Sequence, residues 1–123
     1  MSGIQPPQAR DVYSTMRDLR WSAKEKAIAR RAFDHALHRG LEVTIRQAKQ
    51  MAARIKQPDE LWELERHLTR RRKEIDGKYE FKYSVLLLVL ADLVREGRIT
   101  PDELHGLGED KLRIILDHAR SAA

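Results

Sequence analysis

Residues 59–79, DELWELERHLTRRRKEIDGKY, predict an amphipathic helix with two different faces. At about 100° per residue, an apolar stripe gathers on one side, made of Leu61, Leu64, Leu68 and Ile75. Trp62 lies about 130° from the centre of that stripe, among charged and hydroxyl-bearing side chains. A large aromatic residue beside arginine on a polar helix face is typical of a binding hot spot. We therefore expect this helix to contact another protein.

The expected partner-binding residues surround the tryptophan on that face: Trp62, Glu65, Arg66, Thr69, Arg72 and Lys73. Two interpretations of Trp62 stay open. The indole is either an exposed anchor for a different protein or a residue that packs against a second subunit of a dimer. In both cases Arg66, Thr69 and Arg72 lie near the edge of an interface.

A much longer helix is predicted immediately before this one. Ser22 and Glu25 form a capping box, and Pro58 is the first residue that would end the helix. Its apolar residues recur every three or four positions: Phe33, Leu37, Leu41, Ile45, Ala48, Ala52 and Ile55. Only Gly40 interrupts the pattern, at about 1 kcal/mol for a helix interior. About 35 residues would span about 52 Å.

That length exceeds what a compact chain of 123 residues needs, because its radius of gyration should be about 14 Å. A helix that outreaches its own domain usually buries its apolar stripe on another chain. We therefore expect a homodimer whose interface contains Leu41, Ile45, Ala48, Ala52, Leu61 and Leu64.

The remaining segments predict a small helical head. Residues 80–96 are apolar on nearly every side, which indicates a buried helix that ends at Gly97. Residues 100–103 form another capping box and open a short helical turn, and residues 109–120 form a last amphipathic helix. No run alternates with a period of two. The fold class is all-α, with one long helix and a small helical head in an elongated homodimer. Residues 1–20 are expected to be a flexible tail, and residues 21–123 a single domain.

Composition narrows the function further. The chain has no cysteine, and its longest apolar run is too short to span a bilayer. Its first residues show no apolar signal-peptide region, so a cytoplasmic protein is expected. The net charge is +5, and residues 21–56 carry nine basic side chains against three acidic ones. Such a surface attracts either nucleic acid or an acidic protein.

Few side chains suggest chemistry. His35 and His38 lie three residues apart beside Asp34, a spacing that can hold a metal, but a solvated helix face is the favoured interpretation. No phosphate-binding glycine loop, zinc motif or nucleophile elbow is present. We therefore predict no enzyme, no cofactor and no metal site.

The basic run at residues 70–73 has two interpretations. It can belong to a nucleic-acid-binding dimer that uses the basic long helix, which predicts duplex DNA affinity that falls steeply with salt. Alternatively, Glu74 and Asp76 lie at helical spacings that pair with all four cations. The paired, solvated face is the favoured interpretation, and nucleic-acid binding is the alternative function.

At specific residues the chain resembles the fluorescence recovery protein family. The matching pieces are Trp21-Ser22, Phe33, the DELW of residues 59–62, Leu68, Arg72, the EIDGKY of residues 74–79 and Ser84-Val85. The match covers residues 21–97 without a gap. The EIDGKY segment together with the upstream Leu-Trp pair is specific, since six ordered positions rarely coincide by chance.

The resemblance implies a small all-α homodimer with a long helix and a helical head. Members of that family bind the light-activated orange carotenoid protein through its C-terminal domain. They accelerate its return to the resting orange form and help detach it from the phycobilisome. By resemblance, Trp62 and Arg72 match the tryptophan and arginine implicated in that action, and Leu61 and Ile45 match apolar dimer contacts.

The chain departs from the family pattern beside the tryptophan. Where the cyanobacterial pattern has His-Asp, three and four residues after the tryptophan, this chain has Glu65-Arg66. An acidic position has become basic on the face expected to meet a partner. A like charge on the partner surface would cost several kcal/mol. The fold implied by the resemblance is unaffected, whereas the partner is either an orange carotenoid protein or a related regulated protein.

Overall fold

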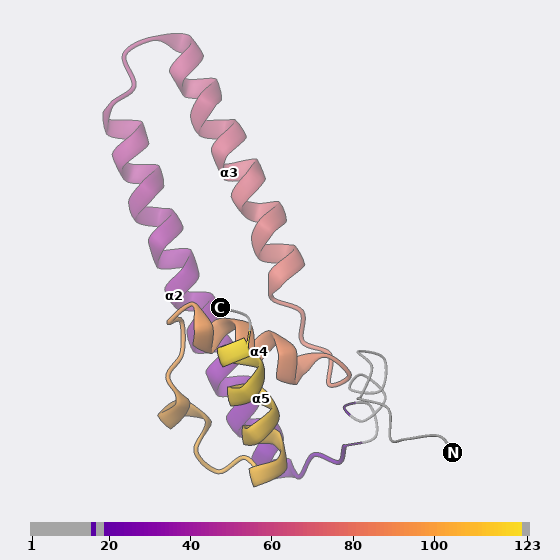
Figure 1. Cartoon of the computed structure of the whole chain (residues 1–123). Coiled ribbons are helices and arrows are strands. Elements are labelled where there is room, and N and C mark those ends of the chain that lie inside the picture. Colours follow the sequence, from indigo (N-terminus) through magenta and orange to yellow (C-terminus); the bar gives the residue numbers. More distant parts are fainter. Residues whose placement is uncertain (1–15, 17–18, 122–123) are drawn as a thin grey trace.

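The first half of the domain is a long hairpin of two helices (Figure 1). The computed structural model describes residue 16 and residues 19–121 of the chain. Helix α2 (Ala23–Ala53) has 31 residues and spans about 46 Å, and α3 (Pro58–Lys78) returns beside it. Most of the expected flexible tail, residues 1–15 and 17–18, lies outside the described residues. Met16 is buried in the core of the head.

Local sequence explains where these two helices begin and end. Ser22 and Glu25 form the predicted capping box, because each side chain accepts a hydrogen bond from the other's backbone N–H, at 3.0 and 3.1 Å. Helix α2 ends at Ala53, and a short turn separates it from Pro58. Pro58 stands at the start of α3, where its missing N–H is no loss. The predicted long helix and second helix are thus confirmed.

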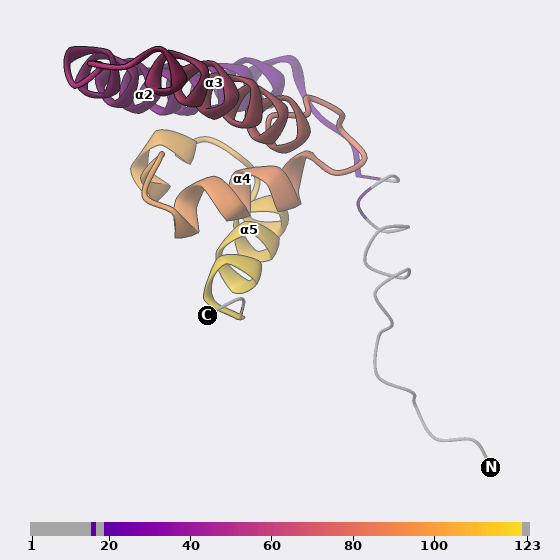
Figure 2. The ribbon, with the colours of Figure 1, turned by 90° about the horizontal axis from the view of Figure 1, so that it is seen from above.

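The head packs on the N-terminal part of α2 and contains α4 (Leu86–Arg95), the short 3-10 helix η1 (Pro101–Leu104) and α5 (Glu109–Ser121). Figure 2 shows α4 and α5 on one side of the layer formed by α2 and α3. Half of α4 is buried, namely Leu86, Leu87, Leu90, Ala91 and Leu93. The prediction of an apolar central helix is therefore confirmed. The described residues contain no strand, and the fold class is all-α.

The expected helix over residues 80–96 begins later than the sequence predicts, at Leu86. The intervening segment carries Phe81, whose ring packs edge-on against Phe33 at 5.1 Å. It also carries Tyr83, whose ring lies 5.2 Å from that of Trp21. A helix would point Phe81 and Tyr83 about 200° apart, so only a non-helical segment lets both rings join one aromatic cluster.

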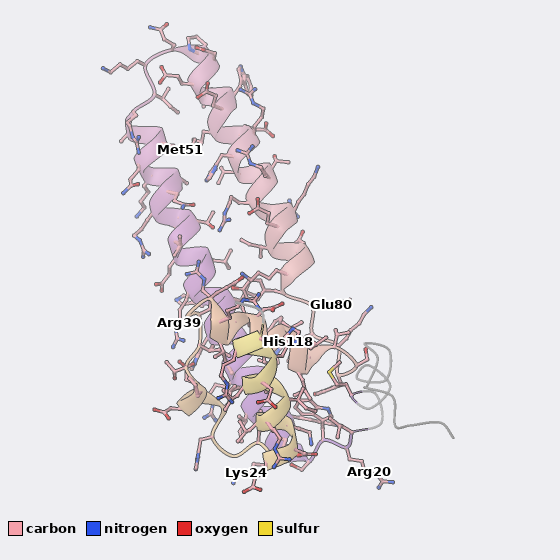
Figure 3. All side chains as sticks on the ribbon, viewed as in Figure 1. Arg20, Lys24, Arg39, Met51, Glu80 and His118 are labelled. Carbon is pink, nitrogen blue, oxygen red and sulfur yellow. The ribbon has the colours of Figure 1, made fainter. Side chains whose placement is uncertain are left out.

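Beyond the head, no other described element lies beside the hairpin. Figure 3 shows Met51 towards the far end of the hairpin and Arg39 where α2 reaches the head. Helix α3 has no buried residue at all. Among the residues that the structure describes, no helix combines the length and apolar character required to cross a membrane.

Candidate protein-binding surface

Trp62 is exposed on the outside of α3. Its side chain is 58% exposed, in agreement with its predicted position on the polar face. The half-buried residues of α3 recur at helical spacing and define the face turned towards α2: Glu60, Leu64, His67, Arg71, Ile75 and Lys78. Trp62 lies about 200° from Glu60 and therefore points away from that face. No described part of the chain covers the indole.

A shallow hollow of about 390 Å³ lies beside this indole. Its walls are mostly apolar, and we name it the Trp62 hollow after its lining residues: Leu61, Trp62, Leu64, Glu65, Leu68 and Thr69. The apolar stripe and the tryptophan therefore border one continuous concavity. A concave apolar patch with an aromatic wall and a polar edge is the usual form of a binding site.

The polar residues expected at this surface divide into two groups. Glu65 and Thr69 line the Trp62 hollow and bond to each other, because the Thr69 hydroxyl donates to Glu65 Oε1 at 2.9 Å. Arg66, Arg72 and Lys73 are exposed but lie outside the walls of the hollow. The structure thus brings only part of the predicted set together.

The basic run is only partly paired. Arg71 Nη1 lies 2.7 Å from Glu74 Oε2, and Arg72 Nε lies 4.0 Å from Asp76 Oδ2. The second pair is almost fully solvated, with the arginine side chain 85% exposed, so it contributes little to stability. Within the described chain, Lys73 has no such partner. The predicted pairing holds for these two arginines.

The residues expected at a dimer interface include large apolar side chains that a single chain leaves open to solvent. Leu41 and Ile45 of α2 are 41% and 52% exposed, and Leu61 of α3 is 48% exposed. Ala52 is exposed as well, whereas Ala48 and Leu64 are half-buried within the hairpin. Leu68 is also 40% exposed and extends the same stripe.

These apolar residues share one side of the hairpin. Leu41 and Ile45 each follow an inward-facing residue of α2 by one position, and Leu61 and Leu68 do so on α3. Moving one residue along a helix rotates the side-chain direction by about 100° about the helix axis, and the direction of the chain sets the sense of that rotation. Because α2 and α3 run in opposite directions, both turns carry the side chains to the same side. We name this the apolar face and define it by Leu41, Ile45, Ala52, Leu61 and Leu68.

The apolar face is directed away from the head. Ala36 is fully buried against the head core, and Ile45 follows it by nine residues, which is a turn of about 180°. Figure 2 shows α4 and α5 on a single side of the hairpin layer. A second molecule can therefore approach the apolar face without meeting the head of the first.

Two carboxylates hold the head to α2. The pKa of Glu25 is lowered to about 2 because the N–H groups of Ser22 and Gly108 donate to it, against an opposing effect of burial. Lys111, only 4% exposed, adds an ion pair to Glu25 at 3.2 Å. Burial raises the pKa of Glu103, but hydrogen bonding and the charge of Arg39 outweigh it, so the net shift is downward.

The histidines do not gather into a metal site in the structure. His35 Nδ1 lies 3.6 Å from Glu103 Oε2, whereas His38 Nε2 lies 2.7 Å from Glu42 Oε1. The two rings therefore have different carboxylate partners. No group of three or more potential ligands is placed to hold a metal ion anywhere in residues 19–121.

Sequence reasoning missed some residues that the structure brings together. Leu68 was in the predicted stripe but not in the predicted interface, although its spacing from Leu61 and Leu64 is the relevant signal. Arg71, Lys78 and Arg98 converge where the hairpin joins the head. No sequence signal connects them, because Arg98 approaches α3 only through the turn after α4.

Known proteins match both the sequence and the fold. The profile of a family described as photoprotection regulator fluorescence recovery protein matches residues 21–117. The fluorescence recovery protein of Synechocystis sp. is 38% identical over 100 residues, which cover 81% of this chain and 92% of that protein. The solved structure of the Fremyella diplosiphon fluorescence recovery protein has a TM-score of 0.76 at 39% identity, covering 82% of this chain and 99% of that one. The solved Synechocystis structure gives 0.77 at 38% identity with the same coverage.

Proposed function

The chain belongs to the fluorescence recovery protein family of photoprotection regulators, and on this premise we propose that it is a dimeric, non-enzymatic regulator that binds another protein through the Trp62 hollow. The observation that carries the proposal is the 58% exposure of Trp62 beside an apolar hollow. Exposed aromatic side chains in partly enclosed apolar sites contribute most of the binding energy at many interfaces. A cytoplasmic location stays a prediction.

A second copy of this chain is the proposed occupant of the apolar face. Four large aliphatic side chains lie on one side of the hairpin, on two elements, and the head does not obstruct them. Burying them between two copies removes this apolar area from water, at about 25 cal/mol for each Å². Leu61 and Leu68 belong to both the apolar face and the Trp62 hollow, so the second copy covers one wall of the hollow. Trp62, Glu65 and Thr69 form the other wall, at the outer edge of the dimer interface, and stay available for a different protein.

The proposed mechanism is selective binding of one conformation of the partner. A protein that binds one of two states more tightly shifts the population towards that state by its differential affinity, without any covalent step. By the family resemblance, the partner is a photoactivated orange carotenoid protein or a related regulated protein. The outcome is then a faster return of that partner to its resting form.

The positive charge of Arg66 beside Trp62 leads to a specific expectation about the partner. Arg66 is exposed one turn along α3 and forms no ion pair with a described side chain, where the cyanobacterial pattern has an acid. A partner surface shaped for an acid presents a positive group, which Arg66 repels. We therefore expect weak activity towards a cyanobacterial orange carotenoid protein, and stronger activity after Arg66→Asp.

The test follows the red-to-orange decay of a photoactivated orange carotenoid protein mixed with this protein. We expect the wild type to accelerate the decay slightly, Arg66→Asp to accelerate it more, and Trp62→Ala to abolish the effect. Arg113→Asp, which reverses the charge of an exposed side chain on α5, is the matched control. No acceleration by wild type or Arg66→Asp at high molar excess would eliminate the carotenoid-protein role.

A further inference from the structure

A second hollow, of about 200 Å³, lies at the junction between the hairpin and the head. We name it the junction hollow. Its walls come from three segments, namely Gly40 of α2, the C-terminal turns of α3 and Arg98 after α4. The α3 wall and the residue that follows α3 contribute Arg71, Glu74, Ile75, Lys78 and Tyr79. None of these residues lines the Trp62 hollow.

Positive charge exceeds negative charge in these walls, with three cations and one carboxylate. Arg71 Nη1 bonds to Glu74 Oε2 at 2.7 Å, and Lys78 pairs with Glu96 outside the hollow. Arg98 has no carboxylate partner among the described side chains; its carbonyl oxygen accepts a bond from Arg39 Nη1 at 2.6 Å. The guanidinium of Arg98 therefore supplies the excess positive charge.

Two further observations indicate that the hollow favours an anion. Arg71 Nε is buried and has no hydrogen-bond partner within the described residues, and an unmade bond to a buried donor is unfavourable. Burial lowers the pKa of Lys78, and the nearby charges of Arg98 and Arg71 lower it further, although Glu96 pairs with it. An anion in the hollow would offset this mutual repulsion, and a turn of the Arg71 side chain would let its buried Nε donate to that anion.

We propose that the junction hollow binds one small oxyanion of the phosphate type between Arg71, Lys78 and Arg98. Guanidinium groups donate two parallel hydrogen bonds to phosphate oxygens, and lysine adds a point charge. A tetrahedral anion accepts bonds from several directions, which suits cations that arrive from α3 and from the turn after α4. A planar carboxylate is satisfied by a single guanidinium fork and suits this arrangement less well.

Such an anion would connect the C-terminal end of α3 to the head. Arg71 and Lys78 belong to the hairpin, whereas Arg98 belongs to the turn that follows the buried helix α4. Because one anion bonds to both, its binding stabilises the hairpin in a fixed position relative to the head. Binding of this anion does not require any protein partner.

The test titrates the full-length protein with inorganic phosphate at constant ionic strength and follows backbone amide signals by nuclear magnetic resonance. We expect saturable shifts centred on Gly40, Tyr79 and Arg98, with a dissociation constant in the millimolar range. Arg98→Gln should weaken binding about fivefold or more, because it removes one charged fork. The control Arg113→Gln removes an exposed arginine on α5, outside the walls of the hollow, and should change nothing.

A second readout keeps the proposal testable if Arg98→Gln alters folding. Phosphate at about ten times its dissociation constant should raise the Tm of the wild type by about 5 °C, relative to chloride at equal ionic strength. Non-saturable shifts, equal phosphate affinity in wild type and folded Arg98→Gln, or acetate binding as tightly as phosphate would each overturn the proposal.

Discussion

At the scale of single residues, Trp62 and Trp21 show how position decides what an indole does. Trp21 is half-buried against the head, with Tyr83 at 5.2 Å and the Lys111 ammonium 5.2 Å above its ring. Trp62 is exposed on α3 and packs into no described core. The first therefore stabilises the fold, and the second is free to contribute to binding.

We predict that replacing each tryptophan by alanine affects a different property: partner binding for Trp62 and stability for Trp21. Trp62→Ala should change the free energy of unfolding by less than about 0.5 kcal/mol, while partner binding falls at least tenfold. Trp21→Ala should lower the free energy of unfolding by about 2–3 kcal/mol, because it empties part of the aromatic cluster. Urea denaturation and partner titration measure the two effects. A strongly destabilised Trp62→Ala would place that ring in a core instead.

Glu25 predicts how stability depends on pH. Its pKa is lowered to about 2 in the folded chain from an ordinary value of 4.5. A lowered carboxyl pKa stabilises the folded state above the unfolded value, and that contribution is lost as pH falls from about 4.5 to about 2. The shift corresponds to about 3 kcal/mol. Glu103 adds a smaller change of the same sign.

Glu25→Gln should therefore lower the free energy of unfolding by about 3 kcal/mol at neutral pH, because Lys111 stays buried without its charged partner. The difference from wild type should shrink towards pH 2. Glu42→Gln is the control and should have little effect, because this half-exposed carboxylate pairs with His38 and with no other described side chain. Urea denaturation across this pH range measures both. A difference that stays constant with pH would contradict the assigned pKa.

At the scale of helices, the contact between Gly40 and Tyr79 explains why a glycine stands inside α2. A Cβ atom at Gly40 would lie 3.0 Å from the Tyr79 hydroxyl, which is held by its bond to the carbonyl of Ala36 at 3.1 Å. The Tyr79 ring also packs edge-on against Phe33. The intrinsic helix penalty of glycine is thus offset by close approach of the segment that follows α3.

This contact predicts a coupling between two substitutions. Gly40→Ala should destabilise the chain by about 1 kcal/mol, because the crowding outweighs the better helix propensity. In a Tyr79→Phe background the hydroxyl is absent, and Gly40→Ala should then be neutral or stabilising. A double-mutant cycle in urea measures the coupling. Additive effects would show that the tyrosine hydroxyl does not restrict this position.

Much of the element order was predictable from sequence, and the exceptions have a physical cause. The N-cap residue Ser22, the first-turn residue Pro58 and the apolar run around Leu90 are local signals, so a helix appears at each of the three places where one is predicted. The late start of α4 was not predictable, because Phe81 leaves the helix to pack on Phe33, a partner 48 residues earlier. The exposure of Trp62 followed from helical periodicity alone.

The candidate surfaces were predictable only in part for the same reason. Periodicity places Trp62 and Thr69 on one helix face, and both line the Trp62 hollow. Periodicity within one helix cannot show which side of a hairpin two helices share. It also cannot show that Arg98 lies beside Lys78, because that approach depends on how the head closes against α3. The contacts that could not be predicted are therefore those that depend on packing between elements distant in the chain.

At the scale of the whole molecule, the proposed homodimer reconciles a small head with a hairpin that extends beyond it. Leu41, Ile45, Leu61 and Leu68 are too exposed for the core of one chain. Helical periodicity puts them on the side of the hairpin opposite the head. Exposed apolar faces of this kind mark interaction sites in soluble proteins. A second copy would cover the apolar face and leave each Trp62 at the edge of the interface.

A charge placed in the apolar face should separate the two copies. Ile45→Glu would bury an unpaired carboxylate in the proposed interface, which is strongly unfavourable. Gln47→Glu is the matched control and should leave assembly unchanged, because it adds the same charge at an exposed position about 200° from Ile45 around α2, outside the apolar face. Circular dichroism should show helical spectra for both variants. Equal assembly of Ile45→Glu and wild type would place the interface elsewhere.

Sedimentation equilibrium of the full-length protein at micromolar concentration gives its molar mass in solution and tests whether a second copy covers the apolar face. The apolar face predicts a mass twice the 14.3 kDa of one chain for the wild type and for Gln47→Glu, and a single-chain mass for Ile45→Glu. A wild-type mass of one chain at these concentrations would contradict the proposed homodimer, because the aliphatic side chains of the hairpin would then have no second copy to cover them.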